Sequence, residues 1–290
     1  QKCDTAWWGR IKKKTCKPVF IGYKDSTIYF NYTDAVTHDS LQVCFKDSNV
    51  VADINYGAKL QGTVPEQIEA AKLLGVRHMR VNSIELSTFN GDVSGIKKWY
   101  DAGFKVIQTV TWEDANPASF AKGKNLEIFK SRLEQLIRAA GDMVSVYVIE
   151  NEQTQEKSFY DYTTNTIFDY LAELQAGVDV CERYQKYVAD GGLHIKIIEQ
   201  ISLGVLRKDN VIRQNECIKY YKTIRYSKFI INVHTEFANN YYVLDQVKKS
   251  CDYLRAQTGH NVMSNEYHTE FCSDEFVAIT VNEWKKAKPL

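Results

Sequence analysis

The sequence has few prolines and no long apolar run. Only 4 of its 290 residues are proline, and no apolar stretch approaches the ~18–20 residues that a membrane-spanning helix needs. A surplus of either charge is also missing, because 37 Lys and Arg residues oppose 36 Asp and Glu residues. The resulting net charge of +1 gives no electrostatic reason to expect nucleic acid or an anionic membrane as a partner.

Motifs that define several other classes of protein are absent too. No CxxC pair occurs, which argues against a zinc ribbon or a thioredoxin-like site. Neither GxGxxG nor GxxxxGK[ST] occurs, which argues against the common nucleotide-binding turns. The seven cysteines are an odd number, and Cys3, Cys16 and Cys44 cluster near the N-terminus, where one pair can form a disulfide. The first residue is Gln1, which fits a removed leader, and we expect a secreted or periplasmic protein.

What is present is an ordinary globular composition in two parts. Hydrophobic residues make up 44 % and charged residues 25 %, which excludes disordered and collagen-like chains. Residues 1–48 are interpreted as a small β-rich extension, with short strands expected at 18–23, 27–32 and 41–45. Residues 49–290 follow a different pattern and are interpreted as a separate barrel domain.

In this second part, apolar strands and amphipathic helices alternate seven times. Strands are expected at 50–56, 76–84, 104–112, 143–149, 194–199, 228–234 and 261–266, and helices at 65–74, 96–102, 126–140, 167–187, 211–224, 241–257 and 276–286. Strict alternation predicts the α/β class, with parallel strands covered by helices. A (β/α)₈ TIM barrel fits better than a doubly wound sheet, which usually brings a Gly-rich first turn. The eighth strand is not evident, and we expect the chain to stop before it.

The predicted ends of these strands are rich in carboxylates, amides and aromatics. Barrel enzymes carry their functional residues at these ends. Neither Lys nor Cys lies there, which argues against a Schiff base or a thiol nucleophile. Two Asn-Glu dipeptides stand out, Asn151-Glu152 after strand four and Asn265-Glu266 after strand seven. One protonated and one ionised carboxyl group facing a common cleft are what cleavage of a glycosidic bond requires.

With these dipeptides, the chain resembles the clan A glycoside hydrolases, a superfamily of retaining (β/α)₈ glycosidases. The matching segments are 148–152, Val-Ile-Glu-Asn-Glu, and 262–266, Val-Met-Ser-Asn-Glu. The resemblance implies a retaining enzyme that cleaves β-glycosidic bonds of a polysaccharide or oligosaccharide and needs no cofactor. It implies Glu152 as the general acid/base and Glu266 as the nucleophile.

Further site residues are expected around this pair. Arg80 resembles the clan's strand-two arginine, which implies that it keeps the nucleophile ionised, and His234 resembles the strand-six histidine. The resemblance implies that Asn151 holds the sugar 2-hydroxyl and that His234 and Tyr267 position substrate or carboxylates. Trp112, at the predicted end of strand three, is a candidate stacking platform for a sugar ring.

The sequence departs from the clan's pattern in two places. Gln153 follows Glu152 where many relatives have proline. The clan usually has a tryptophan on strand eight, below the sugar that is attacked. This chain has no tryptophan after Trp284, which lies in a predicted helix.

Two other functions stay open on the sequence. His-Thr-Glu-Phe occurs twice, starting at His234 and His268, and two such histidines can hold a divalent metal in a metal-dependent barrel hydrolase. Those enzymes usually have a His-x-His pair on the first strand, and Asp53-Ile54-Asn55 contains no histidine. A non-catalytic glycan-binding barrel would carry the same aromatics but would not need two catalytic carboxylates.

Overall fold

The structure of the protein is a computed structural model. It describes the backbone of residues 3–8, 11–16, 19–20, 27–35, 38–45, 57–58, 63–74, 77–113, 119–154, 165–206, 208–235, 241–267 and 286. Its side chains are described in residues 63–72, 77–113, 119–154, 165–195, 197–206, 208–234, 246–265 and 286.

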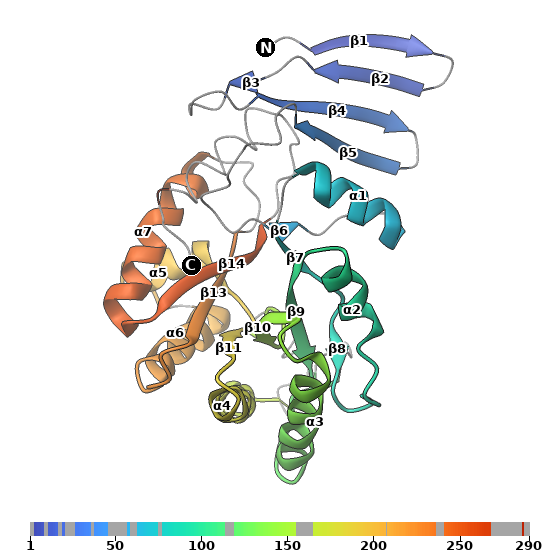
Figure 1. Cartoon of the computed structure of the whole chain (residues 1–290). Helices are drawn as coiled ribbons and strands as arrows, with labels where there is room; N and C mark the ends of the chain where they lie inside the picture. The colour runs from blue at the N-terminus through green and yellow to red at the C-terminus, as the bar shows by residue number, and fades with distance from the viewer. Residues whose placement is uncertain are drawn as a thin grey trace.

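The N-terminal residues contribute an antiparallel sheet (Figure 1). Its strands are β1 (Cys3–Trp8), β2 (Ile11–Cys16), β3 (Val19–Phe20), β4 (Thr27–Ala35) and β5 (His38–Phe45). β4 pairs with β2, β3 and β5, and β1 adds to β2 at the outer edge. The predicted β-rich character of this segment is confirmed, although β1 and β2 were not expected. The domain boundary at residue 49 stays a prediction.

A second sheet is built from parallel strands in chain order. Across it run β6 (Gly57–Ala58), β7 (His78–Arg80), β9 (Lys105–Thr111), β10 (Val144–Ile149), β11 (Tyr187–Asp190), β13 (Phe229–Thr235) and β14 (Asn261–Tyr267). The short strands β8 (Ile84–Glu85) and β12 (Leu193–His194) add to β9 and β13. Within the described residues no pairing joins β14 to β6, so this curled sheet is an α/β half-barrel. The predicted fold class is confirmed as a partial TIM barrel.

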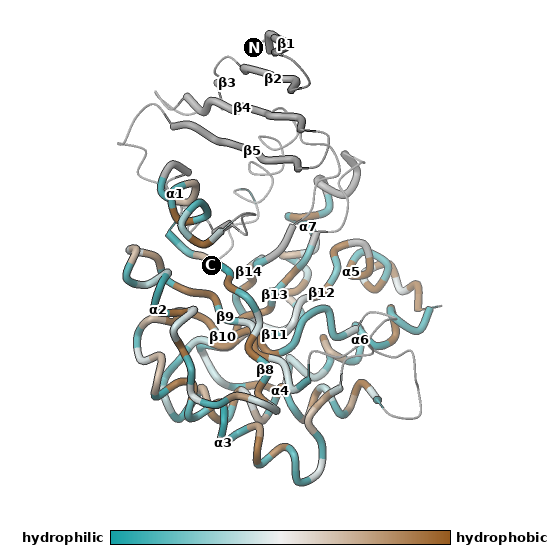
Figure 2. Tube along the Cα trace, turned by 90° about the vertical axis from the view of Figure 1, so that its right-hand side faces the viewer, coloured by the Kyte–Doolittle hydropathy of each residue, from teal (hydrophilic) through white to brown (hydrophobic). Residues whose placement is uncertain are grey.

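Helices lie on the outer side of the half-barrel (Figure 1). They are α1 (Val64–Leu74), α2 (Ser94–Asp101), α3 (Asn125–Ala140), α4 (Ile167–Arg183), α5 (Ile195–Ser202), α6 (Asp209–Tyr221) and α7 (Tyr241–Thr258). Along them apolar and polar residues alternate, as the brown and teal bands of Figure 2 show. None of the helices in the described part has the length and apolar composition that crossing a bilayer requires.

The hydrophobic core has an outer and an inner part. The outer part fills the space between the sheet and its helices, and α4 packs so closely on β10 that a Cβ at Gly177 would lie 2.8 Å from Ile149. The inner part is formed by side chains that point into the half-barrel, Val148, Ala189, Ile230 and Met263. Successive inward positions on a strand are two residues apart.

The interior of the half-barrel therefore changes from apolar to polar towards the C-terminal ends of its strands. On β13 the residues two and four positions beyond Ile230 are Asn232 and His234, both buried. On β14 the residue two positions beyond Met263 is Asn265, whose side chain contacts that of Asn232. A polar mouth thus lies above an apolar floor.

The fifth strand was predicted at the wrong place. The structure ends α4 at Arg183, gives Gln185 a left-handed φ of 54°, and starts β11 at Tyr187. Residues 195–202, predicted mostly as strand, form α5. The four residues of β11 continue the apolar spacing of the preceding helix, and the β-branched isoleucines of α5 favour a strand only locally. The expected strand 50–56 and the expected helix 276–286 lie outside the described residues, apart from residue 286.

The N-terminus of α4 depends on a reciprocal pair of side-chain hydrogen bonds. Asp169 N–H donates to Thr166 Oγ1, and Thr166 N–H donates to Asp169 Oδ2 at 2.7 Å. We predict that Thr166→Ala lowers the free energy of unfolding by about 1 kcal/mol, because one backbone donor loses its partner. Urea unfolding measures this loss. Thr166→Ser keeps the hydroxyl and should lose much less, and equal losses in both variants would contradict the capping role.

Candidate active site

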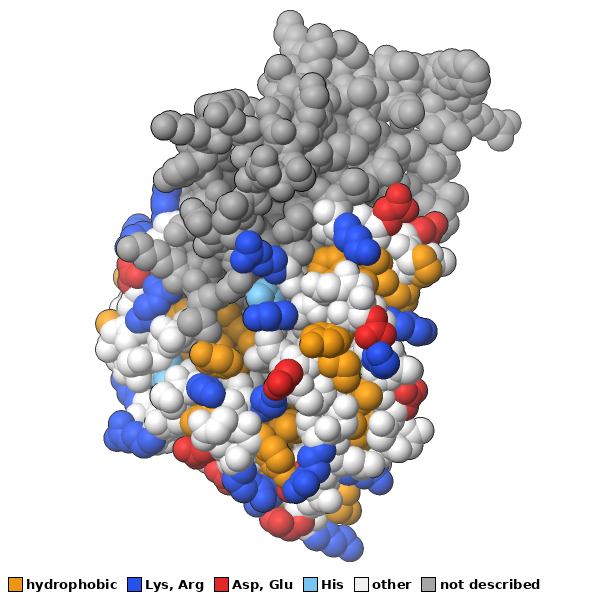
Figure 3. All heavy atoms as spheres, viewed as in Figure 1, with side chains coloured by type: hydrophobic (Ala, Val, Ile, Leu, Met, Phe, Trp, Pro, Cys, Tyr) orange, Lys and Arg blue, Asp and Glu red, His pale blue; other side chains and the backbone are white. Residues whose placement is uncertain are grey.

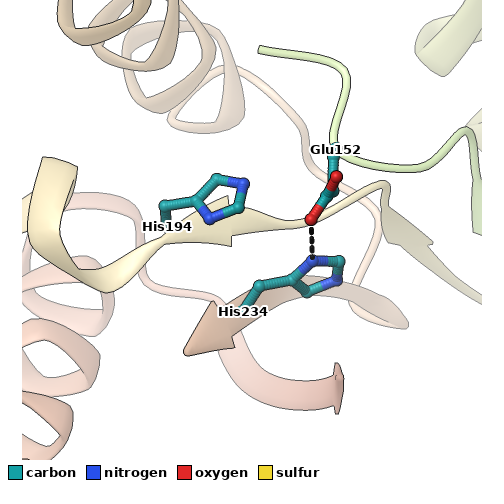
Figure 4. Close-up of side chains that lie close together, drawn as sticks. All are labelled: Glu152, His194 and His234. Atoms are coloured by element: carbon teal, nitrogen blue, oxygen red, sulfur yellow. Dashed lines mark ion pairs between the residues drawn. The ribbon is translucent and has the colours of Figure 1, made fainter. Parts of the chain in front are cut away.

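Polar side chains from neighbouring strands meet at the mouth of the half-barrel. Glu152 follows β10, His194 ends β12, and His234 lies near the end of β13. Figure 4 shows the carboxylate of Glu152 directed towards the ring of His234, with the ring of His194 beside them. The C-terminal ends of parallel strands meet at one edge of the sheet, so residues far apart in the sequence come together there.

The backbone after β10 takes an unusual conformation. Glu150 and Glu152 have φ values of 66° and 50°, a region that side-chain-bearing residues rarely adopt. Glu150 N–H donates to Val110 O at 2.8 Å, and Glu152 N–H donates to Gly191 O at 3.0 Å. These bonds join the turn to the ends of β9 and β11, and they direct the Glu152 side chain into the mouth.

Two glycines after β11 leave room for this arrangement. A Cβ at Gly191 would lie 2.8 Å from the backbone carbon of Glu150, and a Cβ at Gly192 would lie 2.3 Å from His234 Nε2. Gly192 also has φ of 115°, which glycine adopts without strain. Both positions therefore require glycine, because Glu150 and His234 approach the backbone too closely for a side chain.

Hydrogen bonds determine which nitrogen of His234 carries a proton. Asn265 N–H donates to Asn232 Oδ1 at 3.1 Å, so Asn232 Nδ2 must be the group that donates to Asn265 Oδ1 at 2.8 Å. His234 Nε2 lies 2.8 Å from that same oxygen and therefore donates to it as well. The 3.2 Å contact between Asn232 Nδ2 and His234 Nε2 is then a contact between two donors that share one acceptor. In the neutral ring the lone pair is consequently on Nδ1.

This lone pair faces Glu152. His234 Nδ1 lies 3.7 Å from Glu152 Oε1, and His234 is 1 % exposed whereas the Glu152 side chain is 15 % exposed. One nitrogen of His194 completes a group of three donor atoms that lie within 4.8 Å of one another. The Gln214 side chain holds His194 in place, accepting from its N–H at 3.0 Å and donating to its carbonyl at 3.1 Å.

Arg80 contacts the residue before Glu152. Its Nη2 donates to Asn151 Oδ1 at 2.7 Å, which links the end of β7 to the turn after β10. The contact predicted from the resemblance was with the nucleophile. The side chain of Glu266 lies outside the described residues, and that contact stays a prediction. Because Asn151 Oδ1 accepts from Arg80, its amide group is available to donate.

Two buried carboxyl groups support the turn from below. Glu150 is 2 % exposed, and its Oε1 accepts from Trp112 N–H at 2.7 Å. Glu173 on α4 is fully buried and accepts from Ala121 N–H. Burial, together with the charge of Glu150 and a hydrogen bond to it, holds the pKa of Glu173 well above its usual range. A proton on this pair relieves the repulsion between the two carboxyl groups.

A third buried carboxyl group, Asp190, holds β11 to its neighbours. It accepts from Asn232 N–H at 2.5 Å, from Tyr221 OH at 3.0 Å and from Gly192 N–H at 3.3 Å. Burial raises the pKa of Asp190 to about 6 in spite of these bonds. Asp190 thus fixes the glycine turn beside His234.

The remaining predicted site residues have different outcomes. Trp112 is 5 % exposed and packs in the outer core, and its role as a stacking platform stays a prediction. Its position directly after β9 directs the ring into the packed layer, while its backbone N–H donates to Glu150. Glu266 and Tyr267 lie at the end of β14, but only their backbone is described, and His268 is outside the described residues.

His194 is the site residue that the sequence analysis missed. It was expected at the start of a strand, which is the end of the barrel opposite the mouth. The signal that points to it is the segment 190–194, Asp-Gly-Gly-Leu-His, in which a double glycine follows a short apolar strand. Such a pair commonly marks a place where backbone approaches another group closely.

The outer surface carries no field of one sign on the face in view. Figure 3 shows basic, acidic and apolar side chains interspersed over its coloured part. This mixture agrees with the net charge of +1.

No protein-family model and no curated protein matches the sequence. Among solved structures, the AHE enzyme from Alicyclobacillus herbarius is similar with a TM-score of 0.50 at 9 % identity, covering 77 % of this chain and 73 % of that one. A GH26 endo-β-1,4-mannanase domain from Bacillus sp. JAMB-750 has a TM-score of 0.46 at 11 % identity, and the match covers 72 % of this chain and 63 % of that one. A β-glucuronidase from Bacteroides uniformis has a TM-score of 0.45 at 10 % identity, and the match covers 89 % of this chain and 34 % of that one.

The chain thus spans less than two thirds of the length of the mannanase domain and about a third of that of the glucuronidase. At these identities a structural likeness shows the fold alone. The match to the AHE enzyme, with a TM-score of 0.50, therefore supports the fold class and nothing finer.

The raised pKa of Glu173 beside Glu150 makes the stability of the folded protein depend on pH. An unfolded glutamate has a pKa of about 4.3, and the folded value for Glu173 is higher, so the folded state holds a proton that the unfolded state releases. This contribution to stability is complete below the unfolded pKa and is lost as pH rises towards the folded one. Glu173→Gln cannot titrate. We predict that wild type loses stability relative to it by up to about 1.4 kcal/mol per pH unit above pH 5.

Urea unfolding of both proteins at several pH values between 5 and 8 measures this difference. Glu182→Gln, an exposed change on the same helix, is the matched control and should follow wild type. A constant difference between wild type and Glu173→Gln across this range would show that Glu173 is ionised in the folded protein.

Proposed function

We propose that the protein is a retaining β-glycosidase with Glu152 as the general acid/base and Glu266 as the nucleophile. The substrate class is a β-linked polysaccharide or oligosaccharide. The observation that carries this proposal is that His234 faces the Glu152 carboxylate and is paired through its backbone with Glu266. Its Nδ1 faces the Glu152 carboxylate at 3.7 Å, and its Cα is paired with that of Glu266 on the neighbouring strand.

The backbone of β14 supports the same assignment. Its register against β13 shifts between the pairs Asn232–Met263 and His234–Glu266, which marks a bulge just before Glu266. Bulges often occur beside active sites, where they change the direction of a side chain. Adjacent strands are ~4.8 Å apart, so the Glu266 backbone lies one strand spacing from His234. Retaining enzymes keep their carboxyl groups about 5–5.5 Å apart, the separation we expect between Glu152 and Glu266.

The reaction has two steps. In the first, Glu266 attacks the anomeric carbon while Glu152 gives its proton to the departing glycosidic oxygen, forming a glycosyl ester. In the second, Glu152 takes a proton from water, and the water oxygen replaces Glu266 at the same carbon. Two inversions retain the configuration, and Glu152 regains the proton it lost.

The described contacts suit these roles. The 15 % exposure of the Glu152 side chain leaves its carboxyl group within reach of a substrate in the mouth. Arg80 orients Asn151 through the 2.7 Å bond, which frees the amide group of Asn151 to donate to a sugar hydroxyl. A secreted or periplasmic location would bring such an enzyme to polysaccharides and is part of the proposal.

The roles of the two glutamates can be distinguished by comparing substrates with poor and good leaving groups. Glu266→Ala should abolish turnover of all substrates, because no ester forms without the nucleophile. Glu152→Ala should lose ~10²–10⁴-fold on natural glycosides, the usual contribution of general acid catalysis, and much less on activated aryl glycosides. Initial rates on both kinds of substrate, found first by a glycan hydrolysis screen, measure the split.

Added azide gives a second readout that depends on role. It should restore cleavage in both variants, giving a glycosyl azide of inverted configuration with Glu266→Ala and of retained configuration with Glu152→Ala. Glu127→Ala, an exposed change on α3, is the control for purification and folding. Equal and total losses in both variants on activated substrates would contradict the two roles. Intact glycan binding with no hydrolysis by wild type would favour a binding barrel.

A further inference from the structure

We infer that Glu152, His194 and His234 together bind a single Zn²⁺ ion at the mouth of the half-barrel. One donor atom from each lies within 4.8 Å of the other two, and the Glu152–His234 pair is 3.7 Å apart. In a tetrahedral site with bonds of about 2.0–2.1 Å, ligand atoms are roughly 3.4 Å from one another. The Glu152–His234 pair is already close to this spacing, and the longest separation in the group, at most 4.8 Å, shortens when an ion binds.

The hydrogen bonds of His234 prepare it as a ligand. Its Nε2 donates to Asn265 Oδ1, which leaves an unprotonated Nδ1 facing the Glu152 carboxylate. Nδ1 is buried and has no hydrogen bond among the described residues, because Glu152 Oε1 at 3.7 Å is too distant. Metal-binding histidines typically donate their other ring N–H to an oxygen in this way.

The surroundings restrict the backbone of His194 and the ring of His234 before a metal arrives. The Gln214 side chain binds both backbone groups of His194, and the close approach of Gly192 restricts the His234 ring. The rings meet edge to face, with centroids 5.7 Å apart. Donors that are already ordered lose little freedom when an ion binds.

The donor set selects the kind of ion. Two imidazole nitrogens and one carboxylate suit zinc, which leaves a fourth position for water or a substrate group. Magnesium and calcium prefer sites made of oxygen atoms. Zinc here would engage the carboxylate that the proposed function uses as its acid, so, if that function holds, zinc is a reversible inhibitor of glycoside cleavage.

Direct binding measurements test the site without any glycosidase assay. Calorimetric titration of the whole chain with Zn²⁺ at pH 7.5 should give one site per chain, and Co²⁺ should give the visible absorption of a low-coordinate complex. Changes that only affect the orientation of a ligand cost 10–100-fold in affinity, so losing a ligand should cost at least about 100-fold. We expect that loss in His194→Gln and Glu152→Gln.

His78→Ala removes a histidine on β7, outside the cluster, and should bind zinc as wild type does. Thermal unfolding of each variant without metal shows whether it folds, and Zn²⁺ should raise Tm only where the three ligands remain. Zinc binding that persists at wild-type affinity in folded His194→Gln would overturn the site, as would no binding by wild type. A protein that binds zinc but cleaves no glycan would refute the proposed function and leave the zinc site standing.

Discussion

The left-handed turn after β10 is the constraint on which the mouth of the half-barrel depends. Backbone of this kind costs of the order of 1–3 kcal/mol at each non-glycine residue, and both Glu150 and Glu152 adopt it. The bonds from their N–H groups to Val110 and Gly191 offset part of that cost. The turn also needs the empty space at Gly191, because a side chain there would collide with Glu150.

The same turn connects a buried acid pair with an accessible acid. Glu150, which accepts from the backbone N–H of Trp112 and interacts with the buried Glu173, lies two residues before Glu152, which projects into the polar mouth. A shared proton keeps the buried pair from carrying two charges in a place that water does not reach. The two glutamates of this turn therefore have different roles. Glu150 supports the backbone, and Glu152 serves the proposed chemistry.

The alternation of strand and helix was predictable because burial imposes a period on each element. Five of the seven expected strands have counterparts in the structure, and the strand expected at 50–56 lies outside the described residues. The strand that failed, β11, is only four residues long and follows a helix whose apolar spacing it continues. That error hid His194. Its contact with Glu152 and His234 depends on how β11 and β12 lie against β13, which no local pattern encodes. The burial of the Trp112 ring is likewise a tertiary property, which a local pattern does not encode.

The most direct test of the account is to trap the covalent intermediate of the first step. Aryl 2-deoxy-2-fluoro-β-glycosides of the sugars that the protein hydrolyses slow the second step more than the first, so the glycosyl ester accumulates. Proteolysis and mass spectrometry then locate the added sugar. The account predicts one label per chain, on Glu266. A label on another residue, or a first-formed product of inverted configuration, would contradict it.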